Sequence, residues 1–332
     1  MKDYILYAIN LALFDGEVHV TNTTGTDTLS EEMKTYYSDY LIDLAEPELV
    51  HDQFAQKQPI PKNGGKTIQF RQYLPLDSKA NTALEEGKTP DGQKLSMTIK
   101  EATVGQYGGF VEISDMLILT AIDNNLVQAT RLLASQASKV LDAITRDAMA
   151  QGGIRRLAGG VTGPEQLSNA NAKHYLTVND IRLAVRTLKR ANAPKINGSY
   201  MGIIHTDVAY DLMSDPEWKA PHEYKDTENL YEGEIGKIYG VRFVETSEGK
   251  VHEGIGANKS DVYETFICGA DAYGTTEITG GGLEHIVKQL GSAGTADPLN
   301  QRATVGWKAT KVSKVLVDDY LVRIMSAATP EQ

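Results

Sequence analysis

The chain has 332 residues, 41% hydrophobic and 23% charged, with a formal net charge of −11. This composition is typical of a globular protein, argues against a disordered chain, and at this length favours two domains or subdomains. The negative charge disfavours binding to nucleic acid unless basic residues gather on one face. The nearest groups are Arg155-Arg156 and a set at helical spacing, which we interpret as solvated surface: Arg182, Arg186, Lys189 and Arg190.

The cysteine content and the lengths of the apolar runs indicate the cellular compartment of the protein. The single cysteine, Cys268, lies in the apolar run ETFICGAD, which predicts a buried small hydrophobe instead of a nucleophile. No run approaches the roughly 18 apolar residues that span a bilayer. The sequence therefore predicts a soluble protein without disulfides or a membrane partner, made in a reducing cytoplasm.

The N-terminal part predicts an arm followed by a helix. Residues 1–30 end in the weakly patterned polar stretch TNTTGTDTLS, which suggests a flexible lead-in. From Leu29 the pattern becomes helical, with Ser30 as the capping residue, and Pro47 should kink or stop the helix.

Two predicted strands then flank a long polar connection. In KTIQFRQYL, Ile68, Phe70 and Leu74 occupy one face of a strand, and in LSMTIK a second buried face comprises Leu95, Met97 and Ile99. The connection of about twenty residues has almost no apolar content, which is uncommon inside a compact domain. We therefore predict a long hairpin arm that packs against a partner subunit.

The most regular predicted element is a helix over residues 125–151, after a strand in GQYGGFVEISD. Its apolar residues recur three and four positions apart, and Gly152-Gly153 ends it. At 1.5 Å per residue it would be about 40 Å long. The predicted buried stripe is Leu126, Ala129, Leu133, Ala137, Val140, Ile144 and Ala148.

The second half predicts mixed elements. A helix begins near Thr177, capped with the help of Asp180, and buries Ile181, Val185 and Leu188. Residues 200–218 read as strand, helix and stop, strands follow at 241–244 and in ETFICGAD, and Gly280-Gly281-Gly282 marks a boundary. The segments after residue 283 should be strands that return to the sheet begun by residues 95–113.

Two Gly-Lys-Thr triplets, at 65–67 and 87–89, raise the possibility of a nucleotide site. A phosphate-binding loop needs a further glycine five positions before the Gly-Lys pair and a helix after it. The required positions are Ile60 and Thr82, the first triplet opens a strand, and Pro90 follows the second. We interpret the triplets as turns at the base and near the tip of the arm.

Other motifs fail as well. The seven histidines include no pair at the i, i+4 spacing on a helix that a zinc hydrolase uses. His205, near Asp207, is best explained as a structural histidine at a strand end. Asp318 and Asp319 are best explained as a solvated turn. Gly233, Gly236 and Gly240 have the wrong spacing for a dinucleotide turn. The sequence predicts no catalytic, cofactor-binding or metal-binding residues.

Several segments, in this order, resemble the major capsid proteins of tailed bacteriophages, in the branch typified by N-four-like podoviruses and many prophages. They are PKNGGKTIQFRQYLPL with LEEGKTPDG, VGQYGGFVEISD, ITRDAMAQGG, GEIGKIYGVRFVET, and ICGADAYGTTEI with GWKATKVSKVLVDDYLVRI. Herpesvirus capsid floors and encapsulin compartments share this fold. The likeness extends from about residue 30 to the C-terminal end.

The resemblance implies an α+β tailed-phage major capsid fold that is not an enzyme. It implies an N-terminal arm and helix (1–65), an extended hairpin loop over a neighbouring subunit (66–104), a peripheral domain (105–174) with the spine helix 125–151, an axial domain (175–282), and peripheral return strands (283–332). Pentamers and hexamers would build an icosahedral shell around double-stranded DNA without sequence-specific binding. Scaffolding, portal and decoration proteins would be further partners. The shell would form in the cytoplasm of a bacterial host and become the virion capsid.

Two other functions stay open from the sequence. The same fold could build an encapsulin compartment for cargo enzymes, and the Gly-Lys-Thr triplets leave a nucleotide-binding enzyme as the other alternative. Isopeptide cross-links through Lys79, Lys88 or Lys94 are conceivable chemically, but solvated lysines are the default for such a loop.

Overall fold

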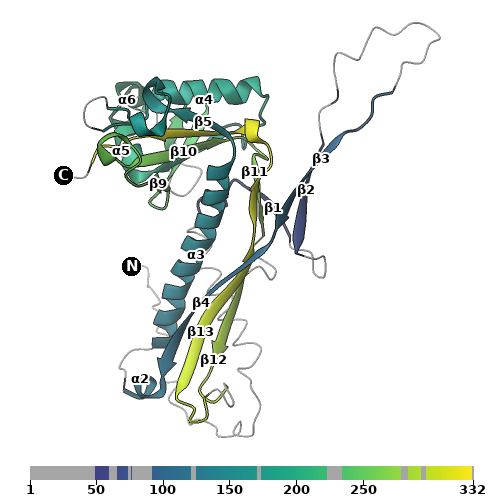
Figure 1. Ribbon diagram of the computed structural model, residues 1–332, viewed down its shortest axis with the longest axis vertical. Helices are drawn as coiled ribbons and strands as arrows, with labels where there is room; N and C mark the ends of the chain where they lie inside the picture. The colour runs from purple at the N-terminus through teal and green to yellow at the C-terminus, as the bar shows by residue number, and fades with distance from the viewer. Residues whose placement is uncertain are drawn as a thin grey trace, which may run out of the picture.

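The computed structural model describes residues 49–59, 66–73, 76, 92–120, 125–169, 173–222, 234–277, 283–292 and 297–330. They form a mixed helix-and-strand molecule with a broad upper part, a long lower part and a hairpin that projects where the two meet (Figure 1). Within the described residues, no helix is long and apolar enough to cross a membrane.

The upper part is built on a seven-stranded sheet with the order β5-β15-β10-β6-β8-β7, in which β9 also pairs with β10. The sheet is mixed, because β6 runs parallel to β8 and β15 parallel to β5, whereas β10 is antiparallel to both of its main neighbours. Its strands are β5 (Ile154–Leu157), β6 (Tyr200–His205), β7 (Glu234–Ile238), β8 (Val241–Thr246), β9 (Lys250–His252), β10 (Val262–Cys268) and β15 (Leu321–Ser326).

Three helices, α4 (Val178–Arg190), α5 (Thr206–Ser214) and α6 (Pro216–His222), cover one face of this sheet. Helix α4 begins with a capping box, in which the Thr177 hydroxyl accepts from the Asp180 N–H and the Asp180 carboxylate accepts from the Thr177 N–H. The opposite face packs against the last turns of α3 (Asn125–Gln151) through Met149, Met201 and Phe266.

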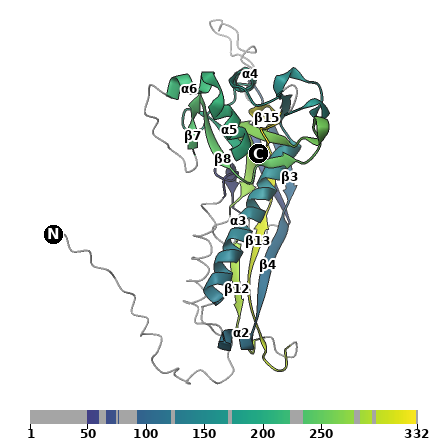
Figure 2. The same cartoon turned by 90° about the vertical axis from the view of Figure 1, so that its left-hand side faces the viewer.

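The lower part consists of α3 lying along a three-stranded sheet of order β12-β13-β4 (Figures 1 and 2). The strands are β4 (Gly105–Ser114), β12 (Leu283–Lys288) and β13 (Arg302–Lys311), and the short helix α2 (Asp115–Thr120) follows β4. Leu133 and Ala137 of α3 pack against Val305 and Trp307 of β13. The burial of this one apolar face gives a helix of about 40 Å a fixed position on the sheet.

Two small sheets connect the arm to the body. Strands β2 (Thr67–Tyr73) and β3 (Met97–Thr103) form an antiparallel hairpin, and a three-stranded sheet orders β1 (Gln56–Gln58), β11 (Tyr273–Thr276) and β14 (Ser313–Val315). Single 3-10 turns complete the architecture: η5 (Ala158–Gly160), η6 (Pro164–Gln166), η7 (Ala257–Lys259) and η9 (Asp318–Tyr320).

The locally patterned elements are confirmed. The helix at 125–151 has the predicted bounds, β2 buries Ile68 and Phe70, and α4 buries Ile181, Val185 and Leu188 as expected. Strands occur at the predicted places near 241–244 and in ETFICGAD, and Cys268 is fully buried. The predicted arm and helix before residue 49, the second Gly-Lys-Thr triplet and Gly280 to Gly282 lie outside the described residues.

Four expectations need correction. Leu95, Met97 and Ile99 were predicted to be buried and are exposed, because β3 turns the opposite face toward the body. In the second half of α3 the buried positions are Leu141, Asp142, Thr145 and Met149, while Val140, Ile144 and Ala148 are only partly buried.

The other two corrections concern connectivity. Helix α5 ends at Ser214, as predicted, but a second helix that was not predicted, α6, begins at Pro216, which occupies the first helical position, where its missing N–H costs nothing. Strands β12 and β13 do return to the sheet of β4, but β15 joins the seven-stranded sheet beside β10.

Candidate assembly surfaces and the buried joint between them

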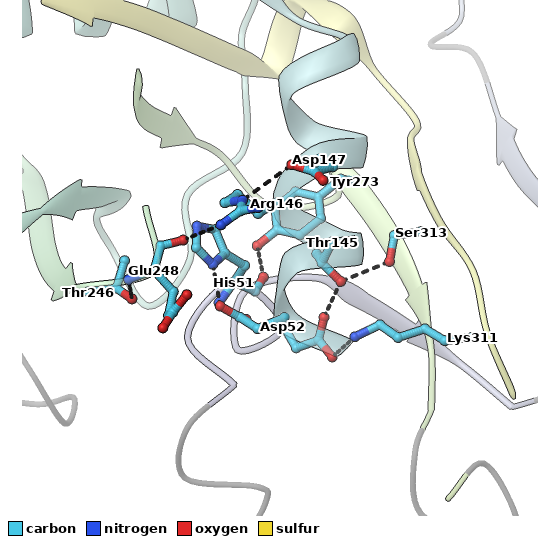
Figure 3. A network of polar contacts seen from close by, with 11 residues as sticks. His51, Asp52, Thr145, Arg146, Asp147, Thr246, Glu248, Tyr273, Lys311 and Ser313 are labelled. Atoms are coloured by element: carbon cyan, nitrogen blue, oxygen red, sulfur yellow. Dashed lines mark hydrogen bonds and ion pairs between the residues drawn. The ribbon is translucent and has the colours of Figure 1, made fainter. Parts of the chain in front are cut away.

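A cluster of buried polar side chains lies where residues 49–59, helix α3 and strands β11, β13 and β14 converge (Figure 3). Its members come from chain segments far apart in the sequence, and we call them the buried joint. They are His51, Asp52, Asp142, Thr145, Tyr273, Lys311 and Ser313.

The hydrogen bonds of the buried joint connect residues 51 and 52 to α3, β11 and β13. Asp142 accepts the His51 N–H at 2.8 Å and pairs with His51 Nδ1 at 2.6 Å. Thr145 donates to Asp52 Oδ1 at 2.5 Å, and Lys311 Nζ donates to Asp52 Oδ2. Because a buried charge without a partner is very costly, these pairs fix one position for the segment that leads into the arm.

Burial makes the two other titratable groups of this region inert near neutral pH. The pKa of Tyr273 is raised well above its usual value by burial, and then by the nearby Cys268, Asp52 and Asp142. Burial likewise raises the pKa of Cys268 to about 12. The phenol therefore stays protonated and donates to the His51 carbonyl at 2.6 Å, and the thiol is no nucleophile.

A second, half-exposed set of charges connects α3 to the upper part of the molecule. Arg146 donates to the Glu248 carbonyl at 2.8 Å, and Lys250 donates to Asp147 at 2.9 Å. Burial alone would raise the pKa of Asp147, but the hydrogen bond from Lys250 and the charges of Arg146 and Lys250 outweigh it and hold the pKa below its usual value. These contacts fix α3 relative to the turn before β9.

The arm hairpin is anchored by an aromatic ring on a glycine. Phe70 of β2 is 2% exposed and lies over Gly274 of β11, where an added Cβ would come within 2.5 Å of the ring. Ile68, Ala102 and Leu316 complete the small core beneath the hairpin. The base of the arm therefore has a defined seat on the body.

The opposite face of the hairpin is an exposed apolar surface. The side chains of Leu95, Met97 and Ile99 are 75%, 42% and 44% exposed, and they occupy alternate positions on one side of the chain. A contiguous group of exposed large apolar side chains is typical of a protein contact surface. We call these three residues the arm face.

A second exposed apolar strip crosses the outer face of the lower sheet. Phe110 of β4 and Ile286 of β12 both pair with Gly306 of β13, so the three residues form one row across the strands. Phe110 is 72% exposed and Ile286 is 40% exposed. The ion pairs Arg302–Glu112 and Lys308–Glu284 lie on either side. An apolar row bordered by charges is the usual composition of a protein contact surface.

The residues that the sequence analysis considered as possible site residues form hydrogen bonds within the fold. His205 caps α5, because its Nδ1 accepts the Asp207 N–H at 3.2 Å, and Tyr263 donates to the Asp207 carboxylate at 2.8 Å. Asp318 and Asp319 are exposed in the single turn η9, as predicted, and Asp318 also accepts the Gly153 N–H at 2.9 Å beyond the end of α3. In the part of the chain that the structure describes, no three metal-ligating side chains gather.

The buried joint was missed by sequence reasoning. Its partners are separated by 91, 93 and 259 positions in the chain, and none of them belongs to a local motif. The one available signal is the pair Asp142 and Thr145, polar residues three apart on a long helix otherwise dominated by apolar and surface positions.

Comparison with known families decides the identity of the chain. A family model described as "Phage capsid protein" matches residues 98–322, which is more than half of the chain. The chain belongs to this family. It is a major capsid protein, a structural protein and not an enzyme, and copies of it form the icosahedral shell of a virion.

Solved structures agree on the fold. The capsid protein in the capsid of Ralstonia phage GP4 has a TM-score of 0.68 at 14% identity, with 100% of both chains covered. The chain from the capsid of cyanophage Pam1 has a TM-score of 0.60 at 14% identity, again with both chains covered completely. A comparison with curated proteins finds no match.

One similar structure is described as a virus-like particle and not as a phage capsid. A virus-like particle from Pyrococcus furiosus has a TM-score of 0.52 at 10% identity, with 88% of this capsid protein and 99% of that chain covered. The fold alone therefore does not separate a phage capsid from another compartment, but the family model does, and the encapsulin alternative is not favoured.

Proposed function

We propose that this capsid protein forms pentamers and hexamers, and that the hairpin arm of each copy covers part of a neighbouring copy. The observation that carries the proposal is the arm face, whose three apolar side chains are exposed beside a base that Phe70 anchors. An anchored arm with an exposed apolar face can bury that face against a partner molecule. In a homo-oligomeric shell that partner is another copy of the chain.

The proposal assigns roles to the parts of the chain. The axial domain around the five- and sixfold axes, residues 175–282, would form most of the upper part, where β5 and β15 complete its seven-stranded sheet. The lower part with α3 and the sheet of β4, β12 and β13 corresponds to the peripheral domain. Contacts repeated over many subunits make a stable shell even where each contact is weak.

We further propose that the shell encloses double-stranded DNA without sequence-specific binding and assembles in the cytoplasm of a bacterial host. A net charge of −11 supports this role, because DNA is then held by confinement instead of adhering to the wall. Scaffolding, portal and decoration proteins are the further partners that such a shell would take. DNA recovered from nuclease-treated particles should show no sequence preference.

The arm is tested by deleting residues 79–93. The deletion removes the connection between the two strands and leaves the anchor at Phe70 and Gly274 in place. We expect a folded monomer with an unchanged circular dichroism spectrum that assembles poorly, as measured by sedimentation velocity and negative-stain microscopy. Normal rings or shells from the deletion variant would show that the arm does not hold neighbouring copies together.

A further inference from the structure

The outer surface of α4 carries positive charges that neither the arm nor the lower sheet uses. Arg182, Arg186, Lys189 and Arg190 are exposed there, and together with Val185 and Tyr239 they line a shallow depression. We call these six residues the α4 patch. Within the described part of the chain, no carboxylate forms an ion pair with any of its four basic side chains.

Tyr239 stands out in the α4 patch because of its backbone. It occupies the two-residue turn between β7 and β8 with φ of 48°, and Gly240 follows with φ of 84°. Such hairpin turns favour Asn-Gly, since a bulky side chain is strained in the left-handed region. The ring is nevertheless 52% exposed, and the Arg182 guanidinium lies 5.4 Å from its centroid. The turn thus presents an oriented aromatic ring at a cost to the backbone.

The sign of the patch is opposite to that of the molecule. The chain carries a net charge of −11, whereas the only acidic residue of α4 is Asp180, which the capping box occupies. A neighbouring copy carries the same excess of acidic groups, which are the complementary partners for these cations. Arginine and tyrosine are also the side chains most enriched in the energetically important centres of protein interfaces.

The geometry points to a head-to-tail contact. Two α4 patches facing each other would repel, so the patch cannot form the centre of a two-fold symmetric contact. Helix α4 also lies on the face of the seven-stranded sheet that faces away from α3. We propose that an acidic surface of the next copy in a ring docks on the α4 patch. The proposal rests on the pentamers and hexamers proposed above, and it names one of the contacts that would close them.

The first test reverses two charges of the patch. Arg182→Glu/Arg186→Glu is compared with Lys173→Glu/Lys314→Glu, which makes the same change in net charge at two exposed lysines elsewhere. The concentration needed for assembly is measured by sedimentation velocity at 50 and 500 mM NaCl. Because salt screens such a contact, wild type and control should need a several-fold higher concentration at high salt. The patch variant should need at least about tenfold more protein at low salt and respond little to salt.

The second test separates docking from folding. Tyr239→Asn places a favoured residue in the turn, so its thermal unfolding midpoint should equal or exceed that of wild type. Its assembly should nevertheless require a several-fold higher concentration, because the aromatic ring is lost from the contact. A structural role for Tyr239 would instead lower the unfolding midpoint together with assembly.

Three results would overturn the proposal. The patch variant could assemble with the threshold and salt response of the control. Alternatively, a filter-binding assay could show that wild type binds a 30-base-pair DNA duplex and that the patch variant does not, while the assembly of the variant is unchanged. The patch would then be a DNA-facing surface. Wild type that forms no rings under any condition would remove the proposed function and the patch with it, whereas the first two results remove the patch alone.

Discussion

Asp52 and Lys311 form an ion pair whose side chains are only 5% and 1% exposed. Removing one member leaves the other charged and buried, which typically costs about 3–5 kcal/mol, whereas replacing both by apolar residues is often neutral or stabilising. We therefore expect Lys311→Ala to be severely destabilised. The double variant Asp52→Leu/Lys311→Met should regain most of that loss, because Thr145 keeps its hydrogen bond to Ser313 at 2.9 Å.

Urea unfolding of the two variants and wild type measures this difference. If the double variant were as unstable as Lys311→Ala, the ion pair would be a net source of stability and not merely a compensated burial.

Asp147 gives a second expectation at this scale, for pH. Its folded-state pKa lies below the usual value, so its contribution to stability is complete above about pH 4, near the unfolded pKa, and is lost as the pH falls through the folded pKa. The side chain is 46% exposed, so Asp147→Asn should cost at most about 1 kcal/mol at pH 7. Thermal unfolding at pH 7 and pH 2.5 checks this, and a difference that persisted unchanged at pH 2.5 would exclude the ionic origin.

At the scale of elements, the packing of α3 on the lower sheet can be tested with adjacent leucines. Leu133 is 3% exposed in the core with Val305 and Trp307, while Leu132 is 71% exposed. Leu133→Ala should cost about 2–5 kcal/mol through lost burial and the cavity left behind. Leu132→Ala should stay within about 0.5 kcal/mol of wild type. Equal losses measured by urea unfolding would contradict the position assigned to the helix.

Elements with a strong local pattern were predictable from the sequence, and their partners were not. The capping box of α4 and its apolar stripe of Ile181, Val185 and Leu188 are close together in the sequence and have helical spacing. The sequence alone therefore predicts the helix and its buried face. Strand β15 shows the limit. Its apolar residues fit any buried strand, and only tertiary packing places it between β10 and β5.

For the candidate surfaces too, local patterns were predictable from the sequence and tertiary contacts were not. Alternation in LSMTIK correctly predicts a strand with an apolar face, but it cannot say whether that face meets the chain's own core or another copy. The pattern of α3 fails in its second half because Asp142 and Thr145 are buried by polar partners, and hydrophobic periodicity has no means of detecting them. The basic residues of α4 were visible as a set, but their relation to Tyr239 depends on the hairpin of β7 and β8.

At the scale of the whole molecule, the arm face separates the stability of one copy from the assembly of many. Met97 is exposed, so Met97→Asp should leave the unfolding free energy of the monomer within about 0.5 kcal/mol of wild type. In a shell the same substitution places a charge in an apolar contact repeated in every subunit. We expect the concentration needed for assembly to rise at least about tenfold, which corresponds to about 1.4 kcal/mol for each contact.

Ser96→Asp is the matched control, because Ser96 is exposed on the same segment but is already polar and lies between the positions of the arm face. It should assemble close to the wild-type threshold, as measured by light scattering and sedimentation velocity. If Met97→Asp and Ser96→Asp assembled equally well, the exposed apolar face would be incidental, and the contacts between copies would have to come from the upper part of the molecule. If both failed equally, added charge anywhere on the arm would be the cause. Only a selective loss at Met97 supports an arm that is held by burying its apolar face against another copy.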